Sequence, residues 1–241
     1  MLSKGQIKLI TSLKQKKYRL QHGCFVAEGI KTINELLESS LTLRTLYTTE
    51  SFNIDAKKEI LITEIELKKI SFLTNPNKAL AVFDIPAAKP ISNQGLIVAL
   101  DDVRDPGNLG TIIRLCDWFG IEELVCSSAT VDCYNPKVVQ ATMGSITRVN
   151  ISYVDLVDYL NTVDLSVFGA FMDGENVYNS VLPESGVLVM GNEANGISQQ
   201  VEAIVSNRIS IPRFGSLKAT ESLNVATATA VLLSEFKRRV Y

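Results

Sequence analysis

The sequence predicts an α/β protein of two units, and three observations lead to that class. Short apolar runs alternate with stretches of helical spacing along the 241-residue chain. A segment rich in proline and small residues, 84–95, interrupts the pattern. Residues 1–94 hold 14 Lys and Arg against 9 Asp and Glu, whereas residues 95–241 hold 10 against 17. We therefore expect one domain at 1–88 and a second domain, with a different role, at 95–241.

The first unit has the pattern of a small α/β domain. Apolar residues at helical spacing predict helices at 3–15 and 29–39. Short runs rich in β-branched and aromatic residues predict strands at 43–48, 60–65 and 80–85.

The second unit alternates more regularly. Nearly continuous apolar runs predict buried strands of a parallel sheet that is covered on both faces, at 96–100, 123–127, 166–171, 186–190 and 208–212. Helical spacing predicts helices between and after them, at 109–119, 136–144, 154–160, 198–206 and about 222–240. Ligands of such sheets bind beyond the carboxyl ends of the strands, so the loops that follow the strands are the candidate sites.

Composition excludes several classes of protein. A hydrophobic content of 46% with nearly balanced charge excludes a disordered chain. No apolar run approaches the ~18 residues of a membrane span, and the lysine-rich first segment lacks a signal-peptide core, so we expect a cytoplasmic protein that does not enter a membrane. The four cysteines form no CxxC pair and His22 is the one histidine, so we expect no metal site, disulfide framework or Ser-His-Asp triad.

A basic block opens the chain. The first twenty residues contain no acid and six basic residues, namely Lys4, Lys8, Lys14, Lys16, Lys17 and Arg19. Such a block binds phosphates, because neutralising them releases condensed counterions. A solvated helix face is the alternative interpretation. The net charge of the two halves favours the first unit as the one that binds a polyanion, with Lys14, Lys16, Lys17 and Arg19 as candidate contacts around the ring of Tyr18.

The loop after 96–100 is the first candidate site. Pro106 and Gly107 predict a turn, and we expect Asn108 to cap the helix that follows. Arg114 follows Asn108 by six residues, and we expect it to share the face of the loop. A dinucleotide-binding fold is one alternative, but its GxGxxG pattern is absent; a capped helix with a structural arginine is the other.

Two later loops are also candidates. After 186–190, the sequence GNEANGIS offers backbone polar groups, with Glu193 as its only charge. An ordinary strand-to-helix turn is the alternative there. After 208–212, Ser222 and Asn224 stand near the start of the last helix. Ser222 fits a helix cap better than a nucleophile, because no histidine is available to activate it.

Taken in this order and spacing, the three loops resemble the motifs of the SpoU (TrmH-like) branch of the SPOUT superfamily, RNA ribose 2′-O-methyltransferases. The first motif is matched by Asn108, Arg114 and Gly120, and the second, G-x-E-x-x-G, by Gly191, Glu193 and Gly196. The third, I-P followed by S-L-N-V, is matched by Ile211-Pro212 and by residues 222–225. The segments KYR (17–19) and GCFVAEG (23–29) resemble the substrate-binding domain of the same family.

Two positions depart from the family pattern. Arg213 stands where a methionine is more usual after I-P, and the segment between Gly215 and Glu221 is longer than the pattern. Neither departure removes a matched functional residue, but the longer segment changes the surroundings expected for the methyl donor.

The resemblance implies a C-terminal domain with a deep trefoil knot and a homodimer formed through that domain. It implies S-adenosylmethionine as the methyl donor, bound through backbone groups of the second and third motifs at Gly191, Ile211 and Leu223, with Asn192 as a neighbour. The substrate it implies is structured RNA, either ribosomal or transfer RNA with ribosomal RNA favoured, and no metal is required.

The resemblance assigns Arg114 the activating role. Because the pKa of a guanidinium lies above ~12, it is a poor proton acceptor. We therefore expect Arg114 to bind a substrate phosphate and stabilise the developing alkoxide, while phosphate or water takes the proton. Asn108, Glu193, Ser222 and Asn224 are expected to hold Arg114 and the ribose in place.

Two other functions are alternative interpretations of the sequence. A non-catalytic RNA-binding relative would be expected to lose Arg114, Glu193 or Asn224, and all three are present. A nucleotide-binding oxidoreductase lacks its glycine fingerprint.

Overall fold

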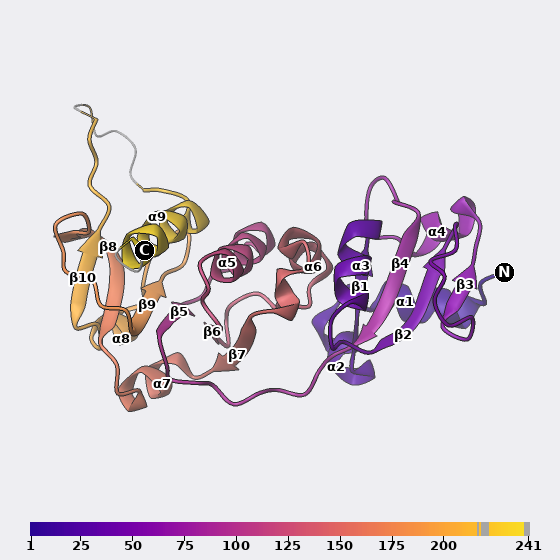
Figure 1. Ribbon diagram of the computed structural model, residues 1–241, viewed down its shortest axis with the longest axis horizontal. Coiled ribbons are helices and arrows are strands. Elements are labelled where there is room, and N and C mark those ends of the chain that lie inside the picture. The colour runs from indigo at the N-terminus through magenta and orange to yellow at the C-terminus, as the bar shows by residue number, and fades with distance from the viewer. Residues whose placement is uncertain (216, 218–221, 239–241) are drawn as a thin grey trace. The chain divides into compact units, whose positions relative to one another are not determined.

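The computed structural model describes residues 1–215, 217 and 222–238. It forms two compact units (Figure 1): Met1–Ala88 with Asp132–Thr147, and Lys89–Val131 with Arg148–Tyr241. The first break falls within the segment that the sequence marks as a boundary. The sequence gives no sign that residues 132–147 belong with the first unit. The guanidinium of Arg19 bonds the carboxylate of Asp132, and the rings of Phe25 and Tyr134 lie 4.7 Å apart.

The first unit is built on a four-stranded sheet in the order β1-β4-β2-β3. The first three strands in that order are antiparallel, and β3 runs parallel to β2. The strands are β1 (Cys24–Glu28), β2 (Leu43–Thr48), β3 (Glu59–Leu61) and β4 (Ala79–Asp84). The helices are α1 (Lys4–Ser12), α2 (Lys16–His22), α3 (Ile30–Leu37), α4 (Glu64–Ile70) and α6 (Pro136–Thr142), followed by the 3₁₀ turn η1 (Ser145–Thr147).

Local capping explains one difference from the sequence prediction in this unit. The expected strand 60–65 ends early, and helix α4 begins at Glu64. Thr63 and Glu66 form a capping box, in which each side chain accepts a hydrogen bond from the other residue's backbone N–H. This pair satisfies free N–H groups at the start of the helix and so favours a helix over a continued strand.

The second unit is built on a six-stranded sheet in the order β10-β8-β9-β5-β6-β7. Every neighbouring pair is parallel, which confirms the predicted parallel sheet. The strands are β5 (Leu96–Leu100), β6 (Glu123–Ser127), β7 (Asn150–Val154), β8 (Val167–Asn176), β9 (Gly186–Met190) and β10 (Asn207–Ser210). The helices are α5 (Pro106–Trp118), α7 (Leu156–Thr162), α8 (Gln199–Glu202) and α9 (Val225–Lys237).

Burial explains which strands of this sheet the sequence reveals. The central strands β5 and β9 are buried at every position, and both lie where the apolar runs predict them. The edge strand β7 is half-buried at every position, and its sequence NISYV carries no continuous apolar run. Prediction from apolar runs therefore misses β7 and places its last residue, Val154, in the predicted helix 154–160.

Helices cover both faces of the parallel sheet. Figure 1 shows α5 and α9 over one face and α7 and α8 over the other. Helix α9 is anchored by Phe236, whose ring meets that of Phe168 edge-on at 5.3 Å. Among the described helices, none has the length and apolar character needed to span a membrane.

Candidate functional site

A cavity of about 600 Å³ lies in the second unit, where β9 and β10 end. The loop after β9, the loop after β10, the start of α9 and the middle of β8 line it. Seven of the residues predicted to hold the methyl donor or the ribose lie in its wall: Gly191, Asn192, Glu193, Ile211, Ser222, Leu223 and Asn224. The structure thus brings two sequence-distant loops together around one space.

Several lining residues were not expected from the sequence. They are apolar residues of regular elements: Ala170, Phe171 and Met172 of β8, Met190 of β9, and Ala228 and Leu232 of α9. Nothing distinguishes such residues from ordinary core residues in a single sequence, because only the assembled fold shows that they face a cavity.

In the loop after β9, the backbone of Gly191 packs directly against the backbone of Gly196 and Ile197. A Cβ at this position would lie 2.2 Å from the carbonyl carbon of Gly196 and 2.3 Å from the nitrogen of Ile197. Two backbone hydrogen bonds of 2.9 Å join Asn192 and Gly196, one in each direction. Only glycine fits at Gly191, because any side chain would force the two strands of this loop apart.

Asn192 fixes the shape of the same loop from within. Its side-chain oxygen accepts hydrogen bonds from the backbone N–H groups of Ala194 and Asn195, at 2.9 and 3.0 Å. Its side-chain nitrogen donates to the carbonyl oxygen of Asp102 at 2.7 Å. Asp102 has a φ of +60°, and its N–H donates to the hydroxyl of Ser127 at 2.9 Å. The loops after β5 and β9 therefore hold each other in place.

Glu193 connects the second motif to the first. Its carboxylate accepts hydrogen bonds from the backbone N–H groups of Arg104 and Asp105, at 3.2 and 3.1 Å. It also accepts one from the side-chain nitrogen of Asn108, at 3.0 Å. Burial by itself raises the pKa of Glu193, but these hydrogen bonds outweigh it and hold the pKa below its usual value. Glu193 is therefore a carboxylate at neutral pH.

Asn108 connects the first motif to the third. Its side-chain oxygen accepts a hydrogen bond from the side-chain nitrogen of Asn224 at 2.8 Å. The oxygen of Asn224 in turn accepts from the N–H groups of Ala226 and Thr227, which makes Asn224 the N-cap of α9. Glu193, Asn108 and Asn224 form one hydrogen-bonded chain, which we call the three-motif network. It runs across the carboxyl edge of the sheet.

Two expectations about helix caps in this region are wrong. Asp105, not Asn108, caps α5, since its carboxylate accepts from the N–H of Asn108 at 2.9 Å. This leaves the side chain of Asn108 free to join the three-motif network. Asn224, not Ser222, caps α9, and Ser222 lies exposed at the cavity wall. Of the longer segment noted between Gly215 and Glu221, residues 216 and 218–221 lie outside the described part of the chain.

Arg114 lies on α5 but does not line the cavity. At 3.6 residues per turn, a separation of six residues places its side chain about 120° around the helix from that of Asn108. The two residues therefore do not share a face, contrary to the expectation. The side chain is exposed, and no hydrogen bond or ion pair joins it to another described residue. Its catalytic role stays a prediction.

The basic block of the first unit contains one structural residue. Lys14, Lys16 and Lys17 are exposed, but Arg19 is only 2% exposed. Its guanidinium donates to the carbonyl oxygens of Leu13 and Lys14, at 2.8 and 2.9 Å, and pairs with the carboxylate of Asp132. Assigning Arg19 to RNA contact is therefore wrong. Its charge is already satisfied inside the unit.

Within the described residues, no group of three or more His, Cys, Asp or Glu side chains is placed to hold a metal ion. The residues that line the cavity instead offer backbone amides, carboxamides, the hydroxyl of Ser222, the carboxylate of Glu193 and the guanidinium of Arg213. Such a set binds a polar organic ligand by hydrogen bonds, with apolar walls to enclose it.

Comparison with known families covers most of the chain. Residues 95–234 match the model described as the SpoU rRNA Methylase family. Residues 4–81 match the model described as the MRM3-like substrate binding domain.

Individual relatives agree with these matches. A TrmH-family structure from Porphyromonas gingivalis is 40% identical, with a TM-score of 0.90 over 99% of both chains. An rRNA methyltransferase from Sinorhizobium meliloti, solved with bound S-adenosylmethionine, is 30% identical, with a TM-score of 0.88 over 100% of this chain and 97% of that one. The 23S rRNA (guanosine(2553)-2′-O)-methyltransferase RlmP from Bacillus subtilis is 28% identical over 230 residues, covering 92% of this chain and 91% of the relative.

Proposed function

The chain belongs to the SpoU rRNA methylase family, and we propose that it transfers a methyl group from S-adenosylmethionine to a ribose 2′-hydroxyl of ribosomal RNA. The observation that carries this proposal is the cavity, which the loops of the second and third motifs line together. The three-motif network ties the first motif to the same place. Ribosomal RNA is favoured over transfer RNA because the Bacillus subtilis relative is named for 23S rRNA.

The residues at the cavity fit S-adenosylmethionine. The volume of the cavity, about 600 Å³, lies within the ~300–1,000 Å³ typical of small-molecule sites. Met190, Ile211 and Leu232 offer apolar walls for an adenosine, and the backbone of the loop after β9 offers polar groups at its edge. When bound, this donor supplies an electrophilic methyl group on a sulfonium centre. Gly191, Asn192, Ile211 and Leu223 are the residues proposed to hold it.

The protein's own contribution is positioning and electrostatics. The three-motif network fixes the start of α5 and the start of α9 relative to the loop after β9. Ser222 stands exposed at the wall of the cavity, where a ribose hydroxyl can approach it. A rigid wall of this kind aligns the 2′-oxygen with the methyl carbon without a metal or a covalent intermediate.

Arg114 is proposed to act on the RNA side of the reaction. Its backbone position lies about 9 Å from that of Asn108 along the axis of α5, at a rise of ~1.5 Å per residue. A planar guanidinium binds a phosphate through two hydrogen bonds and stabilises negative charge that develops on a nearby oxygen. The proton of the 2′-hydroxyl then leaves to phosphate or water.

A methyl-transfer assay tests the proposed function. Purified protein is incubated with labelled S-adenosylmethionine and 23S rRNA transcribed in vitro, which carries no modifications. We expect label in RNA that survives alkaline hydrolysis as a dinucleotide, since 2′-O-methylation blocks cleavage at that position. Donor binding with no incorporation into ribosomal or transfer RNA would instead support a non-catalytic relative.

The exposed lysines of the first unit are proposed to bind RNA phosphates. Replacing Lys14, Lys16 and Lys17 together by glutamate should weaken RNA binding, and the loss should shrink as salt rises. Each phosphate contact that is lost lowers the slope of log K against log salt by roughly one. Filter binding between low and physiological salt measures this slope. Replacing Lys57, Lys58 and Lys69 of the same unit by glutamate is the control for net charge, and an equal loss there would contradict a specific role for the block.

We also propose a homodimer formed through the second unit. The indole of Trp118 on α5 is 83% exposed there, and burying such a ring against a second copy would be favourable. Light scattering at micromolar concentration should therefore give twice the 26.5 kDa of one chain. A mass near 26.5 kDa would contradict the proposal.

We propose two further features that the family resemblance implies. A trefoil knot is compatible with the strand order, in which β9 lies between β5 and β8. We also propose a cytoplasmic location, which is compatible with the proposed ribosomal RNA substrate.

A further inference from the structure

Two exposed aromatic rings, those of Tyr178 and Phe214, follow the ends of β8 and β10, two strands whose residues line the cavity, and we propose that they stack on the base of the nucleotide that is methylated. This inference rests on the proposed function, since it names the part of the substrate that this aromatic pair receives. None of the positions matched to the three motifs carries an aromatic side chain.

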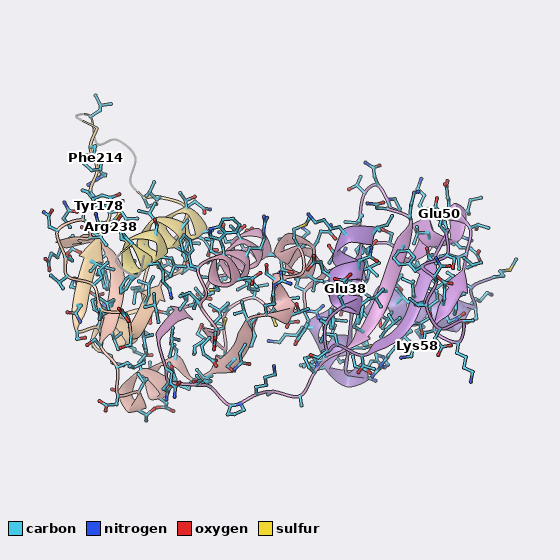
Figure 2. All side chains as sticks on the ribbon, in the orientation of Figure 1. Glu38, Glu50, Lys58, Tyr178, Phe214 and Arg238 are labelled. Carbon is cyan, nitrogen blue, oxygen red and sulfur yellow. The ribbon has the colours of Figure 1, made fainter. Side chains whose placement is uncertain are left out.

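The sheet brings the two rings together. Asn176 at the end of β8 pairs with Ser210 at the end of β10, and the N–H of Val177 donates to the carbonyl oxygen of Ser210 at 2.9 Å. The chain therefore leaves the sheet at two adjacent points on one edge. Tyr178 follows one point and Phe214 the other, with ring centroids 6.2 Å apart and ring planes inclined by 33° (Figure 2).

The aromatic pair is continuous with the wall of the cavity. Ile211, Pro212 and Arg213 line the cavity, and Phe214 is the next residue. On the other strand, Met172 of β8 lines the cavity before the chain reaches Tyr178. A nucleotide's base is joined to the same ribose that carries the 2′-oxygen. We therefore place that base on the side of the cavity where Phe214 follows Arg213.

The exposure of the rings is what a stacking site requires. Phe214 is 83% exposed and Tyr178 37% exposed, so neither contributes much to the core. By contrast, Phe168 and Phe236 of the same unit are 6% and 3% exposed and pack on each other. RNA-binding proteins commonly stack unpaired bases on exposed aromatic rings, and such contacts tolerate any base because every base has a π-face.

Substitutions that remove the rings but keep apolar bulk test the proposal. In Phe214→Leu and Tyr178→Leu, we expect KM for 23S rRNA transcript to rise about tenfold, with the Kd for S-adenosylmethionine unchanged. Phe214→Tyr, which keeps a π-face, should recover most of the affinity that Phe214→Leu loses. Val181→Ala removes a neighbouring apolar side chain that is 81% exposed, and it should leave KM unchanged.

A spectroscopic readout reports stacking independently of turnover. Trp118 is the one tryptophan of the chain, so Trp118→Phe with Phe214→Trp leaves a single indole in the aromatic pair. Its fluorescence should be quenched when the 23S rRNA transcript binds in the presence of S-adenosylhomocysteine. Light scattering on Phe214→Leu and Tyr178→Leu measures whether either substitution changes the oligomeric mass.

The outcomes separate this inference from the proposed function. If the wild-type protein methylates RNA while both leucine variants keep its KM and the indole is not quenched, the stacking role is overturned. If either leucine variant changes the oligomeric mass, the rings belong to a contact between subunits, which also overturns it. If the wild-type protein methylates no RNA, the proposed function fails, and the quenching experiment still decides whether the rings receive a base.

Discussion

Replacing Arg114 by alanine is expected to lower kcat by roughly 10²–10³-fold, the cost of removing one group that stabilises charge in a transition state. Donor affinity should stay near that of the wild type, because Arg114 does not line the cavity. The free energy of unfolding should change by less than about 0.5 kcal/mol, since the side chain is exposed. Single-turnover kinetics, calorimetric titration of S-adenosylmethionine and thermal melting measure the three quantities.

Two variants sharpen the test of Arg114. Arg114→Lys should recover little activity, because an ammonium does not reproduce the planar fork that binds two phosphate oxygens. Arg148→Ala is the control, since Arg148 also lies exposed in the second unit but pairs with Asp117. Full activity in either Arg114 variant would contradict the assigned role.

The second large effect is expected at Gly191. In Gly191→Ala, the new Cβ would meet backbone atoms of Gly196 and Ile197 at 2.2 and 2.3 Å, so the loop after β9 must open. Backbone atoms cannot turn aside as a flexible side chain can. We expect the Kd for S-adenosylmethionine to rise by about 100-fold or more, as this loop forms one wall of the cavity. Isothermal calorimetry measures this change.

A matched glycine controls for the substitution itself. A Cβ at Gly215, in the loop after β10, would meet nothing within 4 Å, so Gly215→Ala should bind the donor as the wild type does. Circular dichroism should show both variants folded. Unchanged donor affinity in folded Gly191→Ala would show that the loop after β9 does not hold S-adenosylmethionine.

The sequence predicts the parallel sheet well because its central strands are buried on both faces. Strands such as β5 and β9 must then be apolar at every position, and a run of this kind is visible without any structure. Strand β1 is buried at every position too, but glycines border its short run, and it was not assigned. Strand β7, at an edge, has no continuous apolar run; its alternation of polar and apolar residues also indicates a strand, but the prediction relied on apolar runs and missed it.

Part of the candidate site was predictable because some of its residues interrupt the apolar pattern near the ends of strands. Gly191 and Glu193 stand in the loop after β9, and Asn108 and Asn224 stand at the starts of α5 and α9, where a polar or glycine residue is conspicuous. Their bonding was not predictable, because the contact between Asn108 and Asn224 spans 116 residues of chain. Arg19 shows the opposite failure. Its neighbours Lys16 and Lys17 are exposed, but only the structure reveals that Asp132 receives its charge.

Comparing ribosomal RNA from cells with and without the gene tests the central claim most directly. Ribose 2′-O-methylation is mapped at every nucleotide, through the resistance of methylated positions to alkaline cleavage. The account predicts that one position loses its methyl group without the gene and regains it with the wild-type gene, but not with Arg114→Ala. Identical methylation maps of ribosomal RNA in the two strains would contradict it.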